Sequence, residues 1–207
     1  MKFTLTYDGE LRSNGDPCQK WEIRRHLHPQ LEELWQIDPA LIRLSRFRYV
    51  PPGGYWHSEM HHSVADERTP PQPDENSIDL CKPIERGARQ FLPLVRDSLL
   101  LKCALKITFL RKEEPGKVYQ GGDLDNRLKT LFDALSIPNK DQVIDDPTMT
   151  GPIYTLLEDD GLITKLDVET HRLLSRPNAS KHEVRLIIEA TVSVTESRLY
   201  NQPFLGG

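Results

Sequence analysis

Residues 121–135 read GGDLDNRLKTLFDAL, and this stretch sets the expectation for the fold. Its apolar side chains follow the i, i+3, i+4, i+7 spacing of an amphipathic helix: Leu128, Leu131, Phe132 and Leu135. Pro138 cannot continue such a helix, because proline lacks a backbone N–H. The sequence therefore predicts a helix that ends before Pro138 and buries one face.

Alternating apolar and polar residues predict strands on both sides of this helix. The runs LKCALKITFL (101–110) and HEVRLIIEATVSV (182–194) have the two-residue period of a half-buried strand. KFTLTY (2–7) shares that period, and the turn-rich DGELRSNGDP after it allows a hairpin or a loop. YTLLEDDGLITKLDVET (154–170) is typical of a strand interrupted by EDDG. We expect an α+β fold, with helices packed on a mixed sheet and an N-terminal hairpin-helix extension.

The first half of the chain carries a second helical pattern. Asp16-Pro17 opens it, and it runs to Gln36 with Trp21 and Trp35 as expected core residues. We predict a break at Pro29, since an interior proline costs about 3 kcal/mol. Prolines predict a long loop over about 50–85, and the tail NQPFLGG is expected to fray. Two divisions stay open: an N-terminal extension (1–96) with a core (97–207), or one continuous domain.

Composition limits the class of protein. The chain has 207 residues, of which 37% are hydrophobic and 28% charged, and its net charge of -4 excludes a generally basic nucleic-acid coat. Three cysteines without a CxxC argue against a disulfide framework or a cysteine zinc site, and suit a reducing compartment. A polar N-terminus and the lack of an 18-residue apolar run predict no signal peptide and no membrane span. We expect a cytoplasmic protein. The sequence has no Walker or Rossmann phosphate-binding loop, so we expect no small-molecule cofactor.

Charge is unevenly distributed around the helix of 123–135. Residues 101–130 carry seven Lys/Arg against four acids, whereas 131–170 carry two lysines against nine acids. Asp123 and Asp125 would point to one side of an extended segment, and Lys129 lies one helical turn after Asp125. Carboxylates that hold Mg²⁺ beside a lysine that binds phosphate would suit phosphodiester hydrolysis. The alternative is a helix cap with solvent ion pairs through Asp133.

Three further groups contain residue types that could bind a metal or nucleic acid, and an ordinary structural or surface role is favoured for each. They are the loop histidines His57, His61 and His62; the helical set Arg24, Arg25, His26 and His28; and the cation–aromatic set Arg43, Arg46, Arg48, Tyr55 and Trp56. The last two sets carry the residue types that contact nucleic-acid backbones and bases.

The run DLDNRLKTLFDAL, followed later by DD before an apolar residue, resembles the RusA family of Holliday junction resolvases. The shared pattern is a DxDN segment, a lysine one turn on, D-A-L at the helix end and a downstream strand with DD. The matching positions are Asp123, Asp125, Asn126, Lys129, Asp133-Ala134-Leu135 and Asp159-Asp160. The resemblance covers roughly residues 97–195.

This resemblance implies a homodimeric, Mg²⁺-dependent endonuclease of branched DNA, active in DNA recombination or repair, with Mn²⁺ as a possible substitute. Asp123, Asp125, Asp159 and Asp160 would be metal ligands. Asp123, Asp125, Lys129 and Asp160 would be catalytic, with Lys129 stabilising phosphate charge and Asn126 supporting the ligand shell.

Two points stay open beside the resemblance. The longer gap after Leu135 holds a rival acidic pair, Asp145-Asp146, although the apolar neighbours of Asp159-Asp160 favour the later pair. The acidic charge, the extra N-terminal residues and the glycines before Asp123 leave the substrate undecided. The alternative function is a catalytically idle DNA- or protein-binding module, as in a mobile-element or defence setting.

Overall fold

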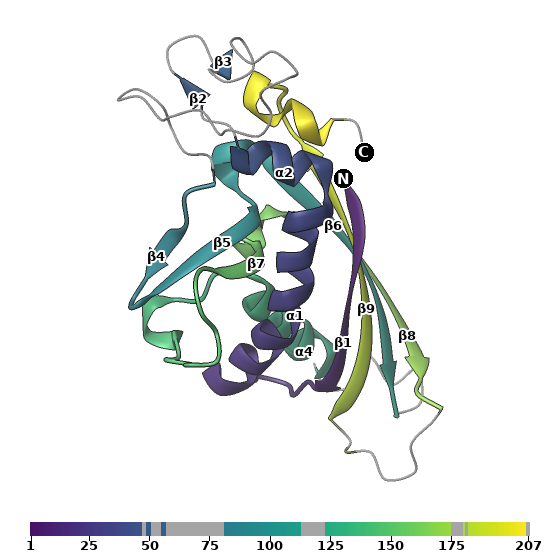
Figure 1. Cartoon of the computed structure of the whole chain (residues 1–207). Helices are drawn as coiled ribbons and strands as arrows, with labels where there is room; N and C mark the ends of the chain where they lie inside the picture. The colour runs from purple at the N-terminus through teal and green to yellow at the C-terminus, as the bar shows by residue number, and fades with distance from the viewer. Residues whose placement is uncertain are drawn as a thin grey trace.

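The computed structural model describes residues 1–46, 49–50, 55–56, 81–112, 123–174, 180 and 182–205. Two of the three described sheets lie on either side of a pair of helices (Figure 1), and the third is the two-stranded sheet β2–β3. The larger sheet holds four strands in the order β1–β9–β6–β8, and a smaller sheet holds β4–β5–β7. The described strands are β1 (Lys2–Glu10), β2 (Tyr49–Val50), β3 (Tyr55–Trp56), β4 (Ile84–Arg86), β5 (Arg89–Val95), β6 (Leu101–Arg111), β7 (Ile153–Leu157), β8 (Ile163–Arg172) and β9 (Glu183–Val194). The described helices are α1 (Pro17–Ile37), α2 (Pro39–Arg46) and α4 (Asp123–Leu135).

The larger sheet is mixed, which confirms the α+β class. Strand β9 runs antiparallel to β1 and to β6, whereas β8 runs parallel to β6. Buried and half-buried residues alternate along the whole of β6, as its two-residue period predicted.

The predicted N-terminal hairpin is wrong. Strand β1 pairs with β9 over a ladder from Lys2–Thr191 to Glu10–Glu183, and the residues after β1 lead directly into α1. The physical reason is burial: Leu5 and Tyr7 join the core beside the apolar face of β9, which a hairpin of turn residues could not supply.

Two chain segments, each made of two consecutive strands, run side by side from the smaller sheet into the larger one. Strand β5 pairs in parallel with β7, and their continuations β6 and β8 also pair in parallel. A short 3-10 turn joins each pair of strands: η2 (Asp97–Leu99) and η4 (Asp160–Leu162). The Glu158 N–H donates to the Val95 carbonyl at 2.9 Å, and the Asp97 N–H donates to the Glu158 carboxylate at 3.1 Å. The two bends are thereby held together.

Helix α1 begins as the sequence predicted and does not break where expected. Asp16 caps it by accepting from the Gln19 N–H at 2.8 Å, and Pro17 occupies the first turn. The predicted break at Pro29 is wrong, because α1 continues to Ile37. Proline removes one hydrogen bond there, while buried side chains on both sides, among them Trp21 and Trp35, hold the helix in place.

Residues 1–96 and 97–207 contribute to a shared core. One cluster of buried hydrophobic side chains extends from Met1 to Phe204, and α1 packs against β1, β7 and α4.

The prediction that the tail frays is wrong for the residues up to Phe204. They form η5 (Leu199–Phe204), which buries the Phe204 ring, and the Asn201 amide donates to the Leu99 and Glu196 carbonyls. Most of the predicted loop over 50–85 lies outside the described residues. Among the described residues, no helix is both long and apolar enough to cross a membrane.

Candidate functional site

Helix α4 carries the acidic motif. It begins at Asp123, so the expectation that Asp123 and Asp125 lie on one side of an extended segment is wrong. Both belong to the first helical turn, where residues two apart are separated by about 200° around the axis. Asp125 and Lys129 are exposed and Asn126 is half-buried, while the side chain of Asp123 lies outside the described residues.

The acidic residue at the end of α4 has a structural partner. The Lys20 ammonium on α1 lies 2.8 Å from the Asp133 carboxylate. Asp133 is therefore held by α1 rather than by Lys129, which is one turn away on its own helix. Within the described part of the chain, neither Asp125 nor Lys129 forms an ion pair, so both charges remain available to a ligand.

Buried Arg24 fastens the carboxyl end of α4 to α1. Its guanidinium donates to the carbonyls of Asp133 (2.7 Å) and Ser136 (3.0 Å) and lies over the Trp21 ring, 5.6 Å from the centroid. Burial lowers the pKa of Arg24 to about 10, with the Asp133 charge acting in the opposite direction. A cation at this end also complements the helix dipole.

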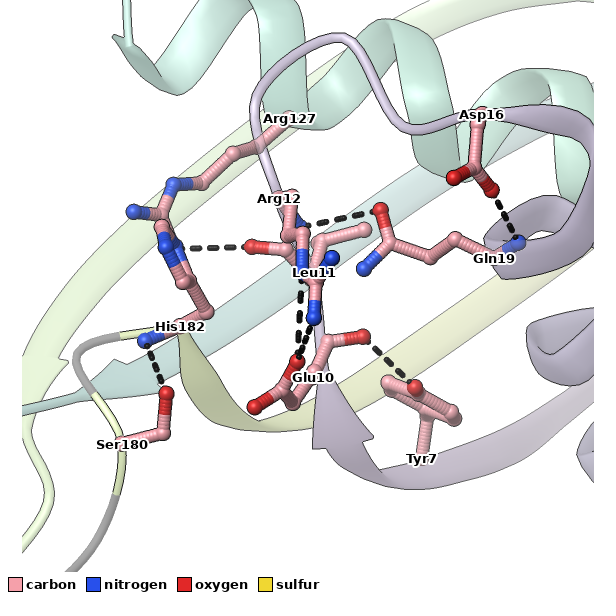
Figure 2. A network of polar contacts seen from close by, with 9 residues as sticks. All are labelled: Tyr7, Glu10, Leu11, Arg12, Asp16, Gln19, Arg127, Ser180 and His182. Atoms are coloured by element: carbon pink, nitrogen blue, oxygen red, sulfur yellow. Dashed lines mark hydrogen bonds and ion pairs between the residues drawn. The ribbon is translucent and has the colours of Figure 1, made fainter.

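The amino-terminal half of α4 is held by the loop that follows β1. The buried Arg127 guanidinium donates to the Leu11 carbonyl at 2.8 Å, and the Gly15 N–H donates to the Thr130 hydroxyl at 2.9 Å. Figure 2 shows Arg127 approaching Leu11 within the polar network that links the end of β1 to the start of α1. These contacts fix the helix that presents Asp125 and Lys129.

Asp159 and Asp160 lie at the bend between β7 and β8. Asp159 precedes η4 and accepts from the Gly161 N–H at 2.9 Å, and Asp160 is the first residue of that turn. Both are exposed. Helix α4 contacts η4, so the motif-bearing helix packs against the turn that carries the second acidic pair.

The alternative acidic pair, Asp145-Asp146, makes contacts that stabilise the fold. Asp146 accepts from the Thr148 hydroxyl (2.6 Å), the Thr148 N–H (2.9 Å) and the Trp21 indole (3.1 Å). These hydrogen bonds, those of Thr148 first, lower the pKa of Asp146 to about 2. Asp145 pairs with Arg89 at 2.9 Å. The pair therefore holds the loop before β7 against α1 and β5.

The other candidate residues divide between the fold and the surface. Arg24 and His28 serve the fold, since the His28 ring accepts from the Tyr154 N–H, whereas Arg25, His26 and Arg43 are exposed. The remaining histidines and Arg48 lie outside the described residues: His57, His61, His62 and Arg48. For Arg46, Tyr55 and Trp56 only the backbone is described. Sequence reasoning missed the positioning roles of Lys20, Arg127 and Thr130. The buried-face spacing of Arg127 between Leu124 and Leu131 was the available signal.

The described carboxylates do not form a metal cage by themselves. Among the described residues, no group of three or more His, Cys, Asp or Glu side chains is close enough to hold a metal ion. Mg²⁺ is commonly held by one or two carboxylates, waters and substrate phosphate, and Asp125, Asp159 and Asp160 offer such oxygens. Comparison with protein-family models, with curated proteins and with solved structures gives no match.

Proposed function

We propose that this chain is a Mg²⁺-dependent endonuclease that hydrolyses phosphodiesters of branched or structured DNA, as its resemblance to the RusA family implies. The observation that carries the proposal is a difference between the acidic residues: some have partners within the fold and others do not. Asp133 and Asp146 are used by the fold, whereas the carboxylates of Asp125 and Asp160 have no hydrogen bond or ion pair with the described residues. Exposed carboxylates kept free of partners are suited to a hard cation.

The proposed metal ligands are Asp123, Asp125, Asp159 and Asp160. Bound Mg²⁺, or Mn²⁺ in its place, would supply a water of lowered pKa and shield the charge on the phosphate. Asp159 keeps one carboxylate oxygen free, because its hydrogen bond to the Gly161 N–H uses the other. Asn126, half-buried beside Asp125 on α4, would support this shell.

Lys129 is the proposed phosphate-binding residue. It lies one helical turn after Asp125, is exposed, and has no ion pair within the described residues. Its ammonium can therefore approach a phosphate beside the carboxylates. Asp125, Asp160, Lys129 and Asp123 form the proposed catalytic set.

A cleavage assay tests the proposal directly. The full chain is incubated with a labelled four-way junction, fork, linear duplex, single strand and RNA, each with Mg²⁺, Mn²⁺ or EDTA. We expect metal-dependent cutting that Asp125→Asn and Asp160→Asn lower at least a hundredfold. Asp141→Asn is the matched control, because Asp141 is an exposed acid in η3 (Lys140–Gln142) and belongs neither to the DxDN segment nor to the Asp159-Asp160 pair.

The outcomes separate the two functions. Cutting of the junction assigns a resolvase, and cutting of another member of the panel keeps the active site with a different substrate. Cleavage by Asp125→Asn at the wild-type rate refutes the proposed site. Salt-dependent DNA binding without turnover in any metal would instead assign the idle binding module.

A further inference from the structure

Side chains of α1 cover the outer edges of two strands. The Gln30 amide accepts from the Thr6 N–H at 2.9 Å and donates to the Thr6 carbonyl at 2.8 Å, so it occupies the free edge of β1. In the smaller sheet, the Tyr154 N–H on the outer edge of β7 donates to His28 at 3.1 Å. Covering unpaired backbone groups in this way prevents a strand edge from pairing with another chain.

Strand β8 forms the other edge of the larger sheet and has no such cover from the described residues. Its hydrogen-bonded neighbour is β6, and in Figure 1 it is the outermost strand on the side away from β1. Its side chains are exposed or half-buried on both faces, and Leu166 is 41% exposed. A ten-residue strand with an open edge and an uncovered leucine is suited to strand addition.

We propose that β8 pairs antiparallel with β8 of a second copy of this chain, with Leu166 on the two-fold axis. The two four-stranded sheets would then form one continuous sheet of eight strands. The resemblance to the RusA family already implies a homodimer. The inference here is the strand and the register through which two copies pair, and it rests on the fold and its charges rather than on the proposed active site.

Charge complementarity selects this register. In an antiparallel pair centred on Leu166, Lys165 lies opposite Asp167 of the second copy, and the two-fold axis repeats that pair. Leu166 meets its own copy, so the exposed leucines cover one another. Lys165 has no ion pair within the described residues and is free to make the contact.

Neighbouring registers bring like charges together. Centring the pair on Asp167 places that carboxylate opposite its own copy, and it directs Lys165 to Glu169, which already pairs with Lys106 at 3.3 Å. Centring the pair on Val168 places Asp167 opposite Glu169 twice. Like charges directly opposite one another destabilise a strand pair. Among these three registers, the one centred on Leu166 has no such contact.

Analytical ultracentrifugation of the full chain over a range of concentrations tests the interface. We expect a dimer for the wild type. Lys165→Asp should weaken it about tenfold or more, because both symmetric pairs become repulsive. The double variant Lys165→Asp/Asp167→Lys restores complementary charges and should restore dimerisation.

A second pair of variants tests the position of the axis. Leu166→Lys should abolish the dimer, since it places two ammonium groups together on the axis. Leu174→Lys is the matched control: Leu174 is 87% exposed and lies beyond the end of β8, so this variant should remain dimeric. Circular dichroism confirms that each variant is folded.

Three results would overturn the proposal. They are a wild-type monomer at every concentration, a dimer unaffected by Lys165→Asp and Leu166→Lys, or a double variant no more dimeric than the single one. None of them bears on cleavage, so the interface and the proposed active site can fail separately.

Discussion

Replacing Arg24 with methionine tests how α1 holds α4. Methionine keeps much of the side-chain volume but removes both hydrogen bonds to the carbonyls of Asp133 and Ser136. Hydrogen bonds from a charged donor contribute about 1.5–3 kcal/mol each, and the carbonyls would lose this donor at the end of a helix. Loss of the buried charge offsets part of this, because its desolvation cost disappears. We expect Arg24→Met to lower the free energy of unfolding by about 2–4 kcal/mol.

Urea unfolding followed by tryptophan fluorescence measures this change, since Arg24 lies over the Trp21 ring. Arg25→Met is the matched control. Arg25 is an exposed neighbour on the same helix whose partner is Glu22, so its replacement should change the free energy of unfolding by less than about 0.5 kcal/mol. Equal stability of the Arg24→Met and wild-type proteins would refute the assignment of Arg24 as the tie between the helices.

Two further predictions concern stability. Burial lowers the pKa of His28 below 6.5, and its Nδ1 accepts from the Tyr154 N–H. As the pH falls, the unfolded chain therefore binds a proton at His28 before the folded chain does, and the free energy of unfolding should decrease below about pH 6.5. His28→Asn should remove this contribution of His28 to the pH dependence, measured by urea unfolding at pH 5 and 7. A Cβ at Gly15 would lie 2.3 Å from Gln19 Oε1 and 2.5 Å from the Thr130 methyl carbon, so Gly15→Ala should cost about 1–3 kcal/mol. Thr130→Ser in that background removes the methyl contact and should recover part of the loss in thermal unfolding, and no recovery would contradict a contribution of the Thr130 methyl to that loss.

Several elements were predictable because their signals are local. The two-residue period of β6 and β9 requires one buried face and one face that is more open to solvent, whatever their partners. The Asp16-Pro17 pair fixes the start of α1 through a side-chain cap and a preset backbone angle. The apolar spacing after Asp123 likewise defined α4.

Pro29 and β1 show where local reasoning failed. The cost of an interior proline is real, but burial of aromatic and aliphatic side chains along α1 outweighs it. The turn residues after β1 allowed a hairpin, whereas the strand found a longer apolar partner at the other end of the chain. Both outcomes depend on contacts between residues far apart in the sequence.

The sequence by itself determined which residues could serve the chemistry: two acidic pairs, an acidic helix start and a lysine one turn later. Only the tertiary structure decided how they are used. The Asp146 carboxylate accepts three hydrogen bonds and Asp133 pairs with Lys20, while the carboxylates of Asp125 and Asp160 have no partner among the described residues. The reason is physical: periodicity reports how each segment alternates between core and solvent, but the partner of a charge is set by which segments the core brings together.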